Sequence, residues 1–141
     1  MAYDLNPDEV LSYGNRRRTA LSSWGNQTAQ IDLASKNADQ GYAQRVASGT
    51  RSWNQGRTRL PGSFIRRNLM NSGIYGRGLQ DFNTARNESF GQLAQDYYNQ
   101  KAQYGVQRNA IDQQYYSQMM DIGEQERLRR AGIAAQLQGI A

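Results

Sequence analysis

The stretch that decides the fold is residues 104–122, YGVQRNAIDQQYYSQMMDI, in which large apolar side chains recur on a helical spacing. Ile111 and Ile122 stand 11 residues apart, and so do Tyr104 and Tyr115. An 11-residue repeat gives about 3.67 residues per turn, which keeps one apolar stripe on one side of a nearly straight α-helix. This stretch therefore predicts a long helix that buries a narrow stripe.

The same spacing extends outward over most of the chain. Toward the C-terminus Ile133 continues one track, while Glu126 interrupts the other before Leu137 resumes it. In the first half a seven-residue repeat also fits several positions, so the period there is open between 7 and 11. The expected helix-packing stripe consists of Tyr13, Trp24, Ile31, Tyr42, Trp53, Phe82, Leu93, Tyr104, Ile111, Tyr115, Ile122 and Ile133.

Prolines and glycines set the expected helix ends. Asn6 can cap a helix that starts at Pro7, with two acidic residues in its first turn. Residues 56–63, GRTRLPGS, are typical of a loop because they combine two glycines with Pro61. A short helix would follow over 64–70, and an Asn-Ser-Gly turn would place Gly73 in a left-handed conformation.

These signals predict an all-α chain of two long helices. We expect a single extended helical unit with a helix over about 7–55, a loop and short helix over about 56–73, and a helix over about 74–138. Two striped helices in one chain favour an extended antiparallel hairpin with a basic bend.

The composition predicts a thin core. Only 38% of the 141 residues are hydrophobic, against about 45–50% in globular domains. Gln and Asn account for 28 residues. The nine Tyr residues suit core packing, or a half-buried interface in which the hydroxyl finds a partner. The glycines at 14, 25, 91, 105, 123 and 132 indicate either local fraying or close approach of helices. The isolated chain should be weakly stable.

Enzyme chemistry is not expected. The chain has no Cys and no His, which removes the usual nucleophile, general base and metal ligands. Gly76-Arg77-Gly78 is too short for a dinucleotide fingerprint. We therefore expect no catalytic, cofactor-binding or metal-binding residues, and no cofactor. Neither a signal peptide nor a membrane-spanning run is visible, which indicates a protein made in a cytosol.

Positive charge is concentrated in the middle of the chain. Between Gln40 and Gln80 there are seven arginines and no acidic residue. We define the basic corner as Arg51, Arg57, Arg59, Arg66, Arg67 and Arg77. Such a cluster would bind an acidic protein surface or nucleic-acid phosphates, whereas the run at 16–18 is more simply a solvated helix face. Apolar residues among the corner arginines favour the protein surface.

Residues 65–82, IRRNLMNSGIYGRGLQDF, carry a resemblance that extends over residues 57–141. A short helix, a Ser-Gly turn, a following Arg and a long Gln- and Ala-rich helix resemble small helical virion structural proteins of tailed bacteriophages. The resemblance implies a non-enzymatic virion component, made in the host cytoplasm and located at the portal, head–tail junction or tail. Its partners would be other virion proteins and copies of itself, with DNA as a second choice.

Two other functions remain open from the sequence. The first is an internal virion protein delivered together with the DNA. The second is a basic helical protein that binds nucleic acid, which would show a steep loss of affinity with salt.

Overall fold

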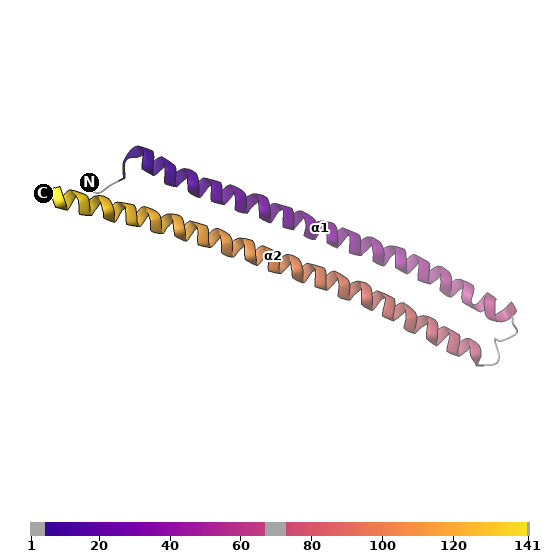
Figure 1. Ribbon diagram of the computed structural model, residues 1–141. Coiled ribbons are helices and arrows are strands. Elements are labelled where there is room, and N and C mark those ends of the chain that lie inside the picture. Colours follow the sequence, from indigo (N-terminus) through magenta and orange to yellow (C-terminus); the bar gives the residue numbers. More distant parts are fainter. Residues whose placement is uncertain (1–4, 67–72, 141) are drawn as a thin grey trace. The chain divides into compact units, whose positions relative to one another are not determined.

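The computed structural model describes residues 5–66 and 73–140 (Figure 1). This part of the chain contains two helices, α1 (Pro7–Arg66) and α2 (Ile74–Ile140), and no strand. The two helices pack against each other through aromatic and polar contacts. The prediction of an all-α chain with two long helices is confirmed.

The start of α1 follows the capping pattern of the sequence. The Asn6 side-chain oxygen accepts a hydrogen bond from the Glu9 amide at 2.8 Å, and the Asn6 carbonyl accepts one from the Val10 amide at 3.0 Å. Pro7 is the first helical residue, where its missing N–H costs nothing. The predicted helix start is therefore confirmed.

The predicted loop over residues 56–63 is wrong, because α1 continues through this segment to Arg66. Pro61 lies inside the helix, where it removes one backbone hydrogen bond. Packing on both sides of it offsets this cost. Gly56 lies against the Phe82 ring, and the Phe64 side chain is buried with its ring against Tyr75.

The predicted short helix over 64–70 is not separate in the described residues, since 64–66 form the last turn of α1. The rest of that prediction, including Asn71-Ser72, lies outside the described residues. Gly73 adopts the predicted left-handed conformation, with φ of 77°. It directly precedes α2 and accepts a hydrogen bond from the Arg77 amide at 3.2 Å, so here it starts a helix.

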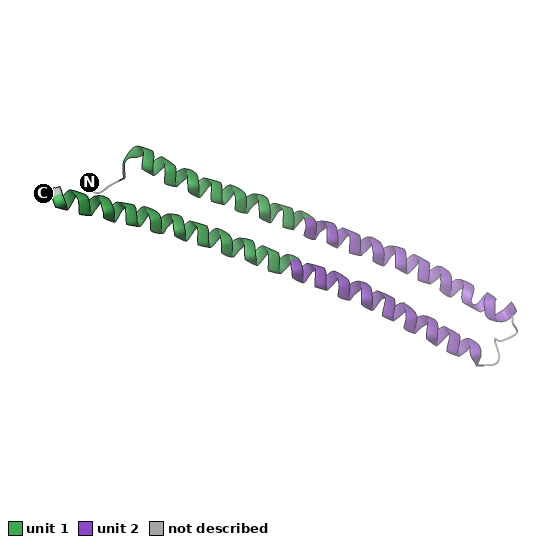
Figure 2. Cartoon of the chain, viewed as in Figure 1, with its two compact units in different colours: residues 1–33, 104–141 green, residues 34–103 purple. Residues whose placement is uncertain are grey.

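The contacts divide the chain into two compact units (Figure 2). Unit 1 comprises residues 1–33 and 104–141, and unit 2 comprises residues 34–103. Each unit contains part of α1 and part of α2, and the two helices contact each other within each unit.

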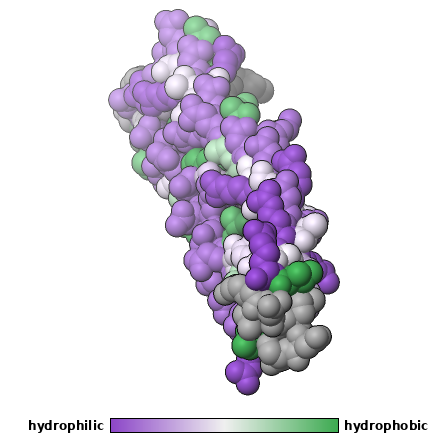
Figure 3. Space-filling model, turned by 90° about the vertical axis from the view of Figure 1, so that its right-hand side faces the viewer, coloured by the Kyte–Doolittle hydropathy of each residue, from purple (hydrophilic) through white to green (hydrophobic). Residues whose placement is uncertain are grey.

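The apolar core is thin, as the composition predicts. Among the described residues only Leu5, Ala20, Phe64 and Ile122 are buried hydrophobic residues, and no large side chain is fully buried. In Figure 3 hydrophobic residues are scattered among hydrophilic ones. The chain exposes 10407 Å².

Three glycines allow close approach of the helices. A Cβ atom at Gly78 would lie 2.5 Å from the Phe64 ring, and a Cβ atom at Gly49 or Gly56 would lie 3.1 Å from Phe90 or Phe82. No such neighbour lies within 4 Å of a Cβ atom at the six glycines 14, 25, 91, 105, 123 and 132. Close approach of another part of this chain is therefore the wrong interpretation for those six.

Candidate interface surfaces

The residues of the expected packing stripe are all shielded in the structure. Each of the twelve is buried or half-buried. In α1 the shielded positions recur every 11 residues at Ala20, Ile31, Tyr42, Trp53 and Phe64. In α2 Glu126 is half-buried, like the apolar residues 11 positions before and after it. The 11-residue burial pattern therefore continues through Glu126 although its side chain is charged. The burial pattern thus favours the 11-residue period over the seven-residue one.

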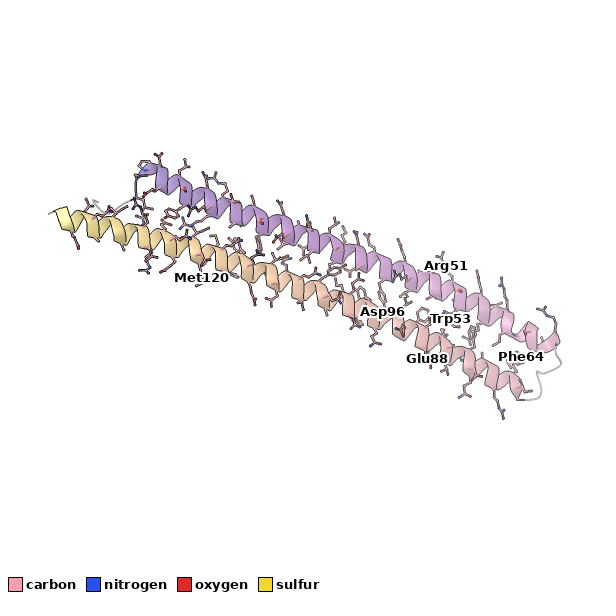
Figure 4. All side chains as sticks on the ribbon, viewed as in Figure 1. Arg51, Trp53, Phe64, Glu88, Asp96 and Met120 are labelled. Atoms are coloured by element: carbon pink, nitrogen blue, oxygen red, sulfur yellow. The ribbon has the colours of Figure 1, made fainter. Side chains whose placement is uncertain are left out.

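Aromatic rings pair across the contact between α1 and α2. Centroid distances are 5.4 Å for the pair in unit 1 and 4.3, 5.1 and 5.3 Å for those in unit 2. The pairs are Trp24–Tyr115, Tyr42–Tyr97, Trp53–Phe82 and Phe64–Tyr75. Figure 4 shows Trp53 and Phe64 directed between the helices. These rings are used inside the chain, which favours core packing for them over contact with a partner.

Polar groups tie the helices together in unit 1. The Trp24 indole N–H donates to Asp112 at 2.7 Å, and Arg108 donates to Asp32 at 2.7 Å. Arg129 pairs with Glu9 at 2.8 Å. Within α2, Arg127 pairs with Glu124 at 2.6 Å.

Glu126 joins both helices through ion pairs. It accepts hydrogen bonds from Arg17 of α1 and, at 3.2 Å, from Arg130 of α2. The Arg17 guanidinium, assisted by Arg130, holds the pKa of the Glu126 carboxyl below its ordinary value. The sequence shows Glu126 only as a break in an apolar track, and its cross-helix partner becomes visible only in the fold.

A second polar cluster lies in unit 2. The Tyr97 hydroxyl donates to Asp39, and the Lys101 ammonium lies 3.0 Å from the same carboxylate. The hydrogen bond from Tyr97, together with Lys101, lowers the pKa of Asp39, and the same bond raises the pKa of Tyr97. The cluster orients the stacked Tyr42–Tyr97 pair.

The basic corner lies on helices instead of in a loop. Arg51, Arg57, Arg59 and Arg66 belong to α1 and Arg77 to α2, and all five are exposed. Arg67 lies outside the described residues. Within residues 5–66 and 73–140 none of these five forms an ion pair. Figure 4 shows Arg51 directed away from α2.

The two units differ in charge. Unit 2 contains ten of the 17 basic residues and only four of the 12 acidic ones. Unit 1 contains seven basic and eight acidic residues, many of them paired with one another. The positive charge of the whole chain therefore belongs to unit 2.

A groove between the helices of unit 1 is not among the features that the sequence predicts. A groove of about 880 Å³ is lined by residues of 8–23 and 118–125, and another of about 410 Å³ by residues of 27–31 and 107–114. A small third cavity shares lining residues with both, so the three follow one another along the same face. Together they are called the groove of unit 1. One signal was present, because residues 19–31 contain no charge and residues 109–120 contain only Asp112.

Other kinds of site receive no support from the described residues. No group of three or more potential metal ligands occurs among them. No helix in this part of the chain has a stretch apolar and long enough to span a membrane. Comparison with protein-family models, curated protein sequences and solved structures finds no match to this chain.

Proposed function

We propose that this chain is a non-enzymatic structural subunit of a tailed-phage virion, which docks through its basic corner on an acidic protein at the portal, head–tail junction or tail. Its frame is an antiparallel helical hairpin formed by α1 and α2. The observation that carries the docking is the charge surplus of unit 2, with exposed arginines that have no carboxylate partner in the described residues. The assignment to a virion rests on the resemblance of residues 57–141.

The chemistry of the corner suits a protein partner. Arginine is enriched at protein interfaces, where its planar head pairs with carboxylates through two hydrogen bonds. Neighbouring positive charges repel each other, and an acidic surface would remove that repulsion. Among the apolar residues between the arginines, Phe64 is used inside unit 2, whereas Ile65 is 59% exposed and open to a partner.

The geometry also constrains the partner's shape. At about 100° per residue, Arg57 and Arg59 point about 200° apart around α1. A single flat surface cannot contact both side chains fully. A partner that surrounds this part of unit 2, such as a ring or a concave acidic surface, can.

Nucleic-acid binding is the second candidate, because exposed unpaired arginines also bind phosphates. An internal virion protein delivered with DNA would use the same contacts. In either case affinity for random duplex DNA should fall steeply with salt.

The experiment replaces Arg57, Arg59, Arg66 and Arg67 with Gln. This removes four positive charges and keeps long side chains that can form hydrogen bonds. If the corner docks on an acidic protein, this variant is missing from assembled particles, while the wild type binds duplex DNA weakly at physiological salt. A matched pair of variants separates local from general charge effects: Arg57→Gln in unit 2 against Arg18→Gln in unit 1, an exposed arginine that does not line the groove of unit 1. Only Arg57→Gln should reduce incorporation.

Two results would oppose the protein-docking proposal. The first is DNA binding by the wild type that weakens steeply with salt, with a logarithmic slope that becomes shallower in the variant by about 0.9 for each phosphate that the removed arginines neutralised. That result would favour the nucleic-acid candidate. The second is normal incorporation of the four-arginine variant without any change in DNA binding, which would leave the corner a solvated surface.

A further inference from the structure

The groove of unit 1 has the form of a site that accepts more helices. Its floor contains Ala20, Ile111 and Ile122, which belong to the packing stripe or adjoin it. Leu11 lines one end and is 60% exposed. Two packed helices with an apolar floor between them are half of a four-helix bundle, in which facing helices cover such a floor.

The walls of this groove are chemically self-complementary. Six glutamines line it, at 27, 30, 107, 114, 118 and 125. Each carboxamide has both donors and an acceptor, so two identical walls can bond to each other without a second chemical type. In a two-fold dimer each surface contacts an identical surface of the other copy. A surface that carries both hydrogen-bond donors and acceptors can pair with itself in this way.

Charge selects the same face. Along residues 19–31 and 109–120 this face contains one charged residue, Asp112, whose carboxylate accepts the Trp24 indole N–H within the unit. The other end of the groove is lined by charges of both signs, Asp8, Arg16 and Asp121. Two copies can therefore meet along the first section without like-charge repulsion. Unit 2, with ten basic and four acidic residues, would repel a second copy of itself.

A dimer contact would cover a small part of the exposed surface. The chain exposes 10407 Å² in all. A stable dimer buries about 1,200–2,000 Å² in total, or roughly 800 Å² per partner.

We infer that the groove face of unit 1, from Leu11 to Ile31 and from Gln107 to Gln125, is the surface on which a second copy of this chain docks. The two copies of unit 1 then form a four-helix bundle through their glutamine-lined grooves. This inference rests on the proposed assembly function and specifies the surface through which two copies of the chain contact each other. It leaves unit 2 available to the acidic partner.

The test measures the oligomeric state of the full-length chain by sedimentation over a wide concentration range. The wild type should form dimers. Gln114→Glu with Gln118→Glu gives each of the two facing grooves two negative charges. The repulsion between the copies should raise the dissociation constant by at least about tenfold. Gln114→Lys with Gln118→Lys should do the same, whereas an equimolar mixture of the two variants should associate as a heterodimer.

The control moves the same charges to neighbouring exposed residues outside the groove, Gln113→Glu with Ser117→Glu, and should leave the dissociation constant unchanged. Circular dichroism checks that every variant retains its helix content. A wild type that stays monomeric, groove variants that associate like the wild type, or a control that dissociates equally would each overturn the inference. A monomeric wild type would leave the basic-corner proposal intact, because that proposal is tested with arginine variants and particles.

Discussion

At the scale of single residues, the contact between Phe64 and Gly78 joins the end of α1 to the start of α2 in unit 2. Phe64 is 7% exposed, and its ring occupies the space that a Cβ atom at Gly78 would need. The glycine is therefore required by packing, although glycine weakens a helix.

Substituting Gly78→Ala should destabilise unit 2. The gain in helix propensity, about 0.5–1 kcal/mol, is smaller than the cost of about 1–3 kcal/mol for forcing an atom into a packed contact. Gly91→Ala in the same unit meets nothing within 4 Å and should be neutral or stabilising. Urea denaturation of both variants measures the difference. Equal gains would show that Phe64 does not rest on Gly78.

Substituting Ile122→Asp should destabilise unit 1, because Ile122 is 9% exposed and the new carboxylate would be desolvated without a partner. We expect a loss of about 3 kcal/mol or more in the free energy of unfolding. Gln113→Asp, at an exposed position of the same helix, should change it by less than about 1 kcal/mol. If both variants lose the same stability, the assigned stripe is wrong.

At the scale of elements, the length of α1 depends on the helix continuing through Pro61. The last turns are held by contacts with α2 and by local bonds such as that from the Thr58 hydroxyl to the Asn54 carbonyl, at 2.9 Å. These contacts keep a helical backbone where the local sequence favours a turn.

Substituting Pro61→Ala should therefore stabilise α1. Alanine restores the missing backbone donor and removes the ring's clash with the preceding turn, which is worth up to about 3 kcal/mol. Thermal unfolding followed by circular dichroism would record the gain. A loss of stability would instead mean that residues 56–63 form a loop, as the sequence alone suggests.

The pairing of Glu126 with Arg17 and Arg130 should make unit 1 sensitive to acid. The pKa of Glu126 is lowered in the fold from its ordinary value of 4.5, so the unfolded chain takes up the proton first as the pH falls. Its contribution to stability is complete well above pH 4.5 and is lost as the pH falls through the folded-state pKa. Glu126→Gln should lower stability at neutral pH and flatten its decline in acid, as urea denaturation at a series of pH values would measure.

A suitable control for this pH profile is Glu88→Gln. Glu88 has no ion-pair partner among the described residues, and Figure 4 shows it directed away from α1. Its substitution should leave the acid limb of the profile unchanged. An unaltered profile in Glu126→Gln would show that other carboxylates govern acid unfolding.

At the scale of the whole molecule, stability should depend on protein concentration. The core has four buried hydrophobic residues among those described, and eleven large hydrophobic residues are exposed. Association through a groove stabilises the folded state by mass action. We expect a broad thermal transition whose midpoint rises with concentration, measured by circular dichroism or calorimetry. A sharp transition at a midpoint independent of concentration would show that the monomer is self-sufficient.

The sequence alone determined those features that depend on near neighbours along the chain. The 11-residue spacing located the buried side of both helices, because the period of a helix is a local property. The Asn6–Pro7 start and the left-handed Gly73 follow from the side chain or backbone freedom of single residues. The cluster of corner arginines is also visible in the sequence, because these residues lie in one segment of the chain.

The tertiary structure alone decided those features that join distant residues. Pro61 remains in α1 because Gly56 and Phe64 pack on residues of α2, more than ten positions further along the chain. Glu126 replaces an apolar side chain in the track because Arg17, 109 residues away, neutralises it. The groove exists only when residues near 20 meet those near 118. Packing and pairing energies between remote positions exceed local propensity here, and no local pattern encodes which positions will meet.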